Sequence, residues 1–384
     1  MKKRISLLLS YVLVATLASG ITLGLTQPAA QEPELSKLEH LESLIEERFV
    51  GEVDTKAIED AAADAMVEAL GDRWSYYIPQ DEYEIYLEQM MNSYVGIGIT
   101  ITATEDSSGL NVVVVDEGGP AQEAGMQVGD LIIAVEGHSC VGMTPVDARN
   151  YVRGEEGTPV QITVLRDGQE LTLTATRRRL EVVVARGEML GDSIGLVTIS
   201  NFDARSAKES IAVIEDLMGQ GAKKLIFDVR NNPGGYASEL VDLLDYLLPE
   251  GELFHMEHYT GEEDYDYSDG DYLDIPMAVL VNADSYSAAE FFAVALQEYD
   301  AGIVVGEKTS GKGYFQKTYE LVDGSAVGLS VGKYYTPSGL SLEGVGITPD
   351  IEVTVDQETY DKINYGHLKP MEDPQILAAI EALK

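Results

Sequence analysis

The sequence predicts a multidomain α/β protein, in which a small β-rich domain is inserted between N-terminal helices and a larger α/β core. Apolar residues recur every three to four positions between residues 33 and 92, a spacing typical of helices. Short β-branched runs, separated by glycine-containing turns, follow as far as residue 178. From residue 181 onward, buried-strand and helical patterns alternate, as they do around a mostly parallel sheet. A length of 384 residues accommodates two or three domains.

Composition excludes several classes of function. The formal net charge is −40, so we expect no nucleic-acid binding through a basic surface. Cys140 is the only cysteine, which leaves no internal disulfide and no cysteine cluster for zinc. The five histidines are scattered, and only His255 and His258 lie close together, in a stretch that we interpret as a loop. We expect no metal and no cofactor.

The N-terminus predicts export. Three basic residues at positions 2–4 precede an uncharged stretch whose apolar part, Ile5 to Leu25, would span roughly 30 Å as a helix, the thickness of a bilayer core. This run is longer than the apolar region of a cleaved signal peptide, and the small residues near Gly20 make a poor cleavage site. We predict a membrane anchor over residues 1–31 in preference to a cleaved signal. In both cases the basic cluster stays inside and the body is exported.

Residues 32–92 are expected to form an N-terminal helical region. An apolar stripe in this region packs either on the protein's own body or on a second copy of the chain, so a homodimer stays open as a prediction. The stripe comprises Leu35, Leu38, Leu41, Leu44 and Ile45. Trp74, the only tryptophan, lies in an aromatic cluster that we interpret as a plug in the core.

The inserted domain, residues 93–180, carries clear strand, turn and helix signals. A helix is expected from Thr144 to Arg153, with Thr144 as its N-cap and Pro145 in its first turn. Asp167 and Gly168 predict a tight hairpin turn. The other expected elements are strands at 94–101, 110–115 and 130–135, a short helix at 119–125, and hairpin strands at 160–166 and 170–176.

Three motifs of this domain, in order, resemble those of PDZ domains. Segment 96–99 matches the Gly-Leu-Gly-Phe loop of that family, and segments 119–121 and 124–130 match its next two signatures. The resemblance implies that the glycine loop offers backbone N–H groups to the terminal carboxylate of a peptide, while the adjoining strand edge pairs with the peptide. The residues expected to bind the peptide are Val95, Gly96, Ile97, Gly98 and Ile99.

The α/β core is expected at residues 181–358. Strands are expected at 195–199, 224–229, 276–281 and 302–305, with a further strand through Tyr319, and helices at 207–218, 238–248 and 291–296. The acidic, tyrosine-rich segment 264–274 lacks the glycine of a calcium-binding EF-hand loop, so we interpret it as a solvated loop. Residues 359–384 are expected to pack on the core as a C-terminal segment.

Ser287 and Lys312 are the strongest candidates for catalysis. Ser287 follows a buried-strand run and precedes a helical pattern, which places its hydroxyl at a helix N-terminus. Lys312 lies between two glycines, just after the next strand. Since one helix and one strand separate the two residues, both return to the same edge of a sheet. A serine becomes a nucleophile when a neighbouring base takes its proton, and a buried lysine with a lowered pKa can be that base.

Several motifs resemble those of the carboxyl-terminal processing proteases, which are tail-specific serine peptidases with an embedded PDZ domain. The matches are Asp-Val-Arg-Asn-Asn-Pro-Gly-Gly at 228–235, Ser-Tyr-Ser-Ala-Ala-Glu at 285–290 and Gly-Glu-Lys-Thr-Ser-Gly-Lys-Gly at 306–313. The resemblance implies that Ser287 is the nucleophile, Lys312 the general base and Gln316 the residue that orients the lysine. The backbone N–H groups of Ala288 and Gly235 are the candidate oxyanion donors.

Three alternatives compete with a Ser-Lys dyad. A Ser-His-Asp triad is compatible with the sequence order, although no histidine lies at an evident strand end. Segment 306–313 nearly matches a nucleotide-binding P-loop, but Gly313 replaces the magnesium-binding hydroxyl and a strand pattern follows, so we reject nucleotide binding. A catalytically dead PDZ scaffold would lack Ser287 or Lys312, and this chain has both.

These features predict a membrane-anchored, exported serine endopeptidase that recognises the free C-termini of proteins or peptides and processes or degrades extracytoplasmic proteins. Arg153, at the end of the helix that walls the PDZ groove, is a candidate regulator. Its guanidinium can bond carboxylates or carbonyls of the core, and a solvated arginine at a helix C-terminus is the alternative. We expect an occupied groove to favour one PDZ position that aligns the Ser287 site.

Overall fold

The structure, a computed structural model, describes residues 36–104, 106–191, 193–364 and 367–384. The chain divides into two compact units, of which the first ends at Ala63 and the second spans Asp64–Lys384. The predicted membrane anchor, residues 1–31, lies outside the described residues. In the part of the chain that the structure describes, no helix is both long and apolar enough to cross a membrane.

The first unit contains helix α2, Lys37–Arg48, and the beginning of α3, Thr55–Glu68. Helix α2 begins at a capping box, in which Ser36 Oγ accepts the Glu39 N–H while the Glu39 carboxylate accepts the Ser36 N–H. Three leucines of the predicted stripe are 41% to 50% exposed, so the surface that covers them stays a prediction. These leucines are Leu38, Leu41 and Leu44.

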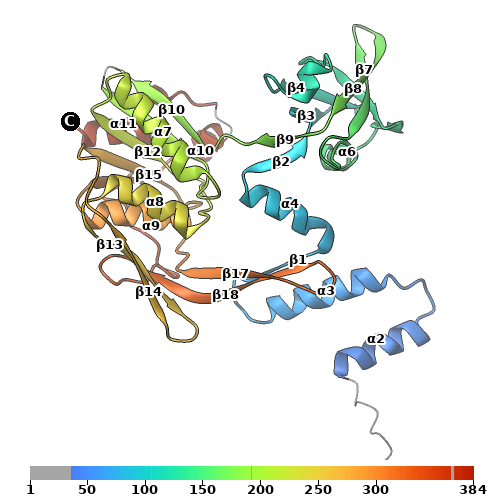
Figure 1. The fold of residues 1–384 in the computed structure, drawn as a ribbon, viewed down its shortest axis with the longest axis horizontal. Coiled ribbons are helices and arrows are strands. Elements are labelled where there is room, and N and C mark those ends of the chain that lie inside the picture. The colour runs from blue at the N-terminus through green and yellow to red at the C-terminus, as the bar shows by residue number, and fades with distance from the viewer. Residues whose placement is uncertain (1–35, 105, 192, 365–366) are drawn as a thin grey trace, which may run out of the picture. The chain divides into compact units, whose positions relative to one another are not determined.

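The α/β core of the second unit is built on a six-stranded sheet with the order β10-β11-β12-β15-β16-β19 (Figure 1). The five strands β11, β12, β15, β16 and β19 run parallel to one another, whereas β10 is antiparallel to β11. The strands are β10 Ala185–Leu190, β11 Ile194–Ile199, β12 Lys224–Asp228, β15 Met277–Val281, β16 Gly302–Gly306 and β19 Ile351–Glu352. The continuous apolar runs of β12 and β15 follow from burial on both faces of the sheet.

Helices cover both faces of this sheet (Figure 1). Phe227 belongs to the cluster that packs against α7, α8 and α9, while its neighbour Ile226 belongs to the cluster that packs against α11, because successive strand side chains point to opposite faces. The helices are α7 Ser206–Gly219, α8 Ala237–Leu247, α9 Ala288–Glu298 and α11 Pro374–Ala382. The C-terminal segment also contains α10 Gln357–Asn364 and the short 3-10 helix η1 Pro370–Glu372.

A second, antiparallel sheet lies outside the parallel core. Part of it occupies segments that were predicted from the sequence to be loops. Its strands are β1 Tyr76–Ile78, β13 Gly251–His258, β14 Glu263–Ser268, β17 Tyr314–Glu320 and β18 Ala326–Tyr335. The predicted loop around His255 is wrong, and so is the first half of the loop predicted over 264–274, because β13 and β14 pair there as a hairpin that ends at Ser268; residues 269–274 are irregular, as predicted. Tyr265 and Tyr267 alternate with aspartates, so the acidic composition concealed a period-two strand pattern.

The PDZ region forms its own sheet, with the strand order β3-β4-β5-β7-β8, and β6 pairs with β5. The predicted single strand at 94–101 is divided at the positive φ of Gly98 (74°) into β2 and β3, and β2 pairs with β9. The Thr144 N-cap and the hairpin turn at Asp167-Gly168 are confirmed. The elements are β2 Ser93–Gly96, β3 Ile99–Ala103, β4 Leu110–Val115, α5 Pro120–Glu123, β5 Leu131–Val135, β6 His138–Ser139, α6 Pro145–Val152, β7 Pro159–Arg166, β8 Gln169–Thr176 and β9 Arg178–Glu181.

Candidate active site

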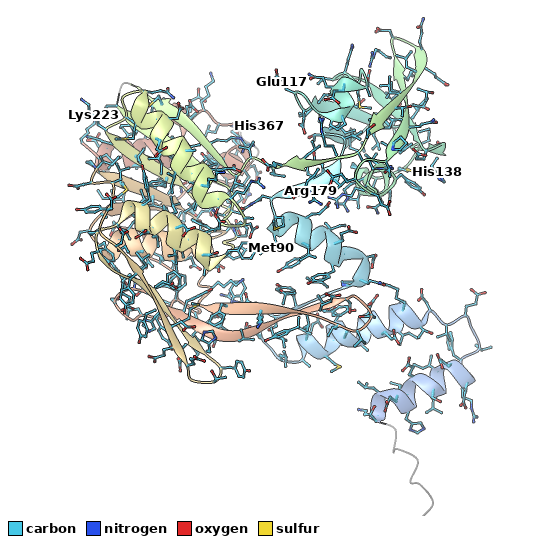
Figure 2. The ribbon with its side chains drawn as sticks, in the orientation of Figure 1. Met90, Glu117, His138, Arg179, Lys223 and His367 are labelled. Carbon is cyan, nitrogen blue, oxygen red and sulfur yellow. The ribbon has the colours of Figure 1, made fainter. Side chains whose placement is uncertain are left out.

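A cavity of about 660 Å³ lies where the loops after β11, β12, β15 and β16 meet. The carboxyl ends of parallel strands are the usual position for a site in an α/β sheet, because the crossover loops converge there. Ser287, Lys312 and Gln316 all line this cavity. Helix α4, Gln80–Met90, supplies another wall, and its last residue, Met90, is labelled in Figure 2.

Ser287 lies in a strained turn between β15 and α9. Its φ of 58° and ψ of −126° lie outside the regions that non-glycine residues ordinarily adopt. The turn is held from below by Ser285, whose Oγ donates to Val229 O at 2.7 Å. A strained strand-turn-helix connection of this kind presents a serine hydroxyl at the top of the sheet. The Ser287 side chain therefore reaches the cavity although only 8% of the residue is exposed.

Two glycines of the loop after β12 lie directly against neighbouring main chain. A Cβ on Gly234 would come within 2.8 Å of Ser287 Cβ, and one on Gly235 within 2.2 Å of the Phe202 carbonyl carbon. Only glycine fits such approaches without moving the backbone. The loop is fixed by the Phe202 N–H, which donates to Gly234 O at 2.7 Å.

The two predicted oxyanion donors are unoccupied by other partners. Among the described residues, neither the Gly235 N–H nor the Ala288 N–H donates a hydrogen bond. Ala288 is the first residue of α9, where a helix leaves its N–H groups without an intrahelical acceptor. Both groups are therefore available to an oxygen atom placed beside Ser287.

Lys312 follows β16 and shares the cavity with Ser287, without a direct hydrogen bond between the two side chains in the described structure. Lys312 Nζ lies 5.0 Å from the ring centroid of Trp74 and 5.6 Å from that of Tyr286. Burial lowers the pKa of Lys312 below its ordinary value, because the ammonium form loses its hydration. The carboxylates of Asp72, Glu290 and Glu343 oppose this shift.

Gln316 lines the same cavity but does not make the predicted contact. Its Nε2 donates to Ser330 Oγ at 3.0 Å and to Tyr314 O at 3.2 Å, and in the described part of the chain no hydrogen bond joins it to Lys312. The prediction assumed continuous strand geometry between the two residues. Strand β17 instead begins only at Tyr314, and its register shifts between Phe315 and Gln316.

Glu290 is a central residue of the site that the sequence reasoning did not assign. Its buried carboxylate accepts four hydrogen bonds, from Ser287 N–H at 3.0 Å and Lys312 N–H at 2.8 Å on Oε2, and from Gly311 N–H at 2.8 Å and Thr309 Oγ1 at 2.5 Å on Oε1. One carboxylate thus joins the serine turn to the lysine turn. The sequence signal that could have found this residue is the Ser-x-x-Glu pattern of a capping box, with Glu290 three residues after Ser287 at the start of a helix.

Trp74 does not form the predicted core plug. It is half-buried beside the site, where its ring stacks on Tyr286 at a centroid distance of 5.9 Å and its Nε1 donates to the Glu343 carboxylate at 3.1 Å. The neighbouring Arg73 donates to Ser310 O at 3.1 Å and to Gly311 O at 2.9 Å. These long-range contacts brace the lysine turn, and local sequence holds no signal for them.

Arg230 connects the glycine loop to the C-terminal segment. Its guanidinium donates to Asp228 within β12, to Asp373 Oδ2 at 2.8 Å and to Gln375 Oε1 at 2.8 Å. The arginine is 9% exposed, so this ion-pair network is almost fully withdrawn from water. The segment that begins α11 is therefore part of the support of the site.

The structure bears on the two chemical alternatives. No histidine of the described part of the chain lines the cavity: His255 and His258 belong to β13, and His138 and His367 (Figure 2) also lie outside its lining. The Gly306–Gly313 segment leads into strand β17 and not into a helix, which agrees with the rejection of a P-loop. The described residues contain no group of His, Cys, Asp and Glu suited to a metal ion.

Comparison with known proteins decides the family. A model of peptidase family S41 matches residues 193–353, and a PDZ-domain model matches residues 112–166. The carboxy-terminal processing protease CtpA of Bacillus subtilis (strain 168) is 30% identical over 377 residues, which cover 95% of this chain and 80% of that protein. The chain belongs to peptidase family S41.

Two further comparisons give a second relative and a likeness of fold. A "Probable CtpA-like serine protease" of Staphylococcus aureus (strain COL) is 30% identical over 359 residues, which cover 92% of this chain and 70% of that protein. A Bacteroides fragilis NCTC 9343 structure described as an S41 protease shares the fold, with a TM-score of 0.53 at 18% identity over 91% of this chain and 98% of that chain. The S41 peptidase described here is a serine-type protease with a PDZ domain and an α/β protease core.

The PDZ domain of this S41 peptidase carries a groove of about 390 Å³. The predicted peptide-binding residues 95–99 line it, together with α6. Ile97 O accepts the Ala121 N–H at 2.8 Å and Gly98 O accepts the Asp116 N–H at 3.0 Å, which fixes the loop. The Ile97 and Gly98 N–H groups have no partner within the described residues, and such paired main-chain donors suit a carboxylate.

Arg153 of the S41 peptidase lines the same groove and pairs with α4. Its Nη1 lies 2.8 Å from Glu88 Oε2, while the other oxygen of Glu88 accepts the Val95 N–H at 2.8 Å. The predicted carboxylate partner thus lies on α4, outside the α/β core, and the alternative of a solvated arginine is not observed. Since residues of α4 also line the catalytic cavity, this helix touches both sites.

Proposed function

We propose that this S41 peptidase is an endopeptidase that hydrolyses peptide bonds with a Ser287–Lys312 dyad. The observation that carries the proposal is the shared cavity, which combines a serine on a strained turn with a half-buried lysine of lowered pKa. The N–H groups of Gly235 and Ala288 beside this serine support it, since they donate to no acceptor among the described residues. Proximity of a nucleophile, a base and oxyanion donors is the arrangement that acyl transfer requires.

The proposed chemistry moves one proton in each direction. Neutral Lys312 accepts the hydroxyl proton as Ser287 Oγ attacks the peptide carbonyl carbon, and the oxyanion is held by the two main-chain N–H groups. The lysine ammonium then donates its proton to the leaving amine, and a water molecule repeats the sequence on the acyl-enzyme. We assign Gln316, held by Ser330, a role in positioning the β17 wall beside Lys312.

We further propose that the PDZ groove captures substrates by their free C-termini. The loop of residues 96–99 offers main-chain donors, and the apolar side chains of the groove suit an extended peptide. The N-terminal basic and apolar sequence supports action outside the cytoplasm, with the body either anchored by residues 1–31 or released after cleavage. The proposed role is C-terminal processing or regulated degradation of extracytoplasmic proteins.

The dyad is tested with the full chain purified in detergent and a quenched fluorescent peptide. Ser287→Ala and Lys312→Ala should each lower kcat/KM by roughly 10³-fold or more, and the double variant should be no worse, because the two residues act as a unit. Lys308→Ala is the matched control, since Lys308 is an exposed lysine in the same turn. Substantial cleavage by Ser287→Ala protein with an unchanged melting temperature would overturn the assignment.

A further inference from the structure

Asp203 lies in the catalytic cavity and has no role in the chemistry proposed above. It follows β11 and lines the cavity together with Ser287 and Lys312. Its main chain lies against the glycine loop, since a Cβ on Gly235 would come within 2.5 Å of Asp203 N. The aspartate is therefore held next to a candidate oxyanion donor, within reach of a substrate residue close to the scissile bond.

The Asp203 carboxylate has no partner within the described residues. No hydrogen bond or ion pair reaches it, and only its main chain is engaged, with the Asp203 N–H donating to Asn201 Oδ1 at 3.0 Å. The nearby Arg205 is turned away, because its guanidinium binds Glu209 and main-chain oxygens such as Met91 O. The carboxylate is half-buried and lines the cavity, so its oxygens are available to a substrate group that enters there.

A second carboxylate strengthens the negative field at this position. Burial first, and then the charge of Glu239 on α8, raises the pKa of Asp203 to about 7. Glu239 itself is satisfied, since it accepts the N–H groups of Arg205 at 3.1 Å and Ala207 at 2.9 Å. A cation bound at Asp203 would relieve this repulsion and restore the ionised form of the carboxylate.

Two tyrosine rings complete the surroundings of this carboxylate. Tyr236 and Tyr286 line the cavity, and the Asp203 charge adds to burial in raising the pKa of both phenols. Asp284 also contributes at Tyr286. Aromatic faces beside a carboxylate attract ammonium and guanidinium groups, because both the ring and the carboxylate are negative toward the cation.

We propose that Asp203, with Tyr236 and Tyr286, forms a subsite that binds a lysine or arginine side chain of the substrate next to the scissile bond. Lys312 does not compete for this position, because the carboxylates that act on its ammonium are Asp72, Glu290 and Glu343. The subsite rests on the proposed endopeptidase function. It adds a preference for basic residues that neither the dyad nor the PDZ groove provides.

The test uses the full-length protein in detergent and C-terminally amidated quenched peptides, which carry no free carboxylate for the PDZ groove. Lysine or its uncharged isostere norleucine is placed in turn at each position flanking the cut. At one position the lysine peptide should exceed the norleucine peptide in kcat/KM by about tenfold. Asp203→Asn should bring this ratio to about one. Asp242→Asn, which removes one negative charge from an exposed site on α8, should keep it.

A binding measurement separates this proposal from the dyad. In the Ser287→Ala background, the lysine peptide should bind about tenfold more tightly than the norleucine peptide, as measured by fluorescence anisotropy in physiological salt. Equal affinities, or a lysine preference that survives Asp203→Asn, would overturn the subsite. Cleavage by the folded Ser287→Ala protein would instead overturn the dyad and leave the binding preference to be judged by itself.

Discussion

The two cavities of the second unit differ in the chemical groups that line them. The catalytic cavity is lined by reactive or titratable side chains, among them Ser287, Lys312 and Asp203, and the buried Glu290 carboxylate joins the turns that carry Ser287 and Lys312. The PDZ groove is lined mainly by apolar side chains, with Arg149 and Arg153 of the α6 side and the main-chain groups of residues 96–98 as polar features. The catalytic cavity depends on the protonation states of its side chains, and the PDZ groove depends on the conformation of its main chain.

This difference predicts which substitutions each site should be sensitive to. Removing a single charge or hydrogen-bond acceptor should disable the catalytic cavity, because its geometry relies on side chains that no neighbour can replace. The PDZ groove should be sensitive to glycine substitutions and tolerant of charge changes. The following predictions test this contrast, in order of decreasing effect.

Glu290→Gln should have the largest effect. A glutamine offers one acceptor oxygen to four donors and brings an NH₂ group against two of them, which costs roughly 2–4 kcal/mol and misplaces both catalytic turns. We expect kcat/KM to fall at least about 100-fold and the melting temperature to drop, as measured by peptide cleavage and calorimetry. Glu298→Gln, at the other end of α9, is the control: its carboxylate accepts only exposed hydrogen bonds from Ser338, so both quantities should change far less. Retained activity would show that the two turns hold their geometry without this carboxylate.

The rate of cleavage in the catalytic cavity should depend on pH through Lys312. Only neutral Lys312 can act as base, and because burial lowers the pKa of Lys312 from its ordinary value, the neutral fraction is larger at any given pH than for a solvated lysine. Below this pKa, kcat/KM should rise by up to about tenfold per pH unit, and above it the rate should level off. An amidated norleucine peptide avoids the Asp203 subsite and isolates this effect. A flat profile of the folded enzyme from acidic to alkaline pH would contradict lysine as base.

Gly98→Ala should weaken the PDZ groove by a smaller factor. Gly98 has a φ of 74°, and an added Cβ would lie 2.9 Å from Asp116 Oδ2, so the loop that we propose binds the terminal carboxylate must move. We expect the affinity for peptides with a free C-terminus to fall by about tenfold, measured by anisotropy against amidated versions. Gly118→Ala shares the positive φ (67°) but has open space around it, so it should leave this affinity unchanged. Equal effects of both substitutions would point to strain alone.

Arg153→Ala should have the smallest effect, because it acts between the two cavities. Losing the 2.8 Å ion pair with Glu88 should reduce the stimulation of cleavage by free-carboxylate peptides about two- to threefold. Glu88→Gln should cause the same loss, and the double variant should be no worse than either single variant. Additive losses in this cycle would show that Arg153 and Glu88 act separately, and the gating role of Arg153 would then fail.

The sequence anticipated the elements that depend on local pattern. The strands β11, β12, β15 and β16 and the helices between them were predicted because apolar period and turn residues mark them directly. The same reasoning placed Ser287 and Lys312 at one edge of the sheet, since parallel strands bring their carboxyl ends together. The Thr144 N-cap and the Asp167-Gly168 hairpin depend on nearest neighbours and were equally accessible.

What failed depended on contacts between distant residues. The hairpin of β13 and β14 was concealed by its acidic composition, and the Gln316 contact by a register shift that is set through pairing with β18. Trp74 braces the lysine turn through Glu343, its hydrogen-bond partner, which lies 269 residues away in the sequence. The chain by itself thus determined which residue types could perform acyl transfer. Only the tertiary structure decided that Glu290 joins the two turns and that the Asp203 side chain faces the same cavity without a partner among the described residues, because burial and hydrogen-bond satisfaction are properties of the packed molecule.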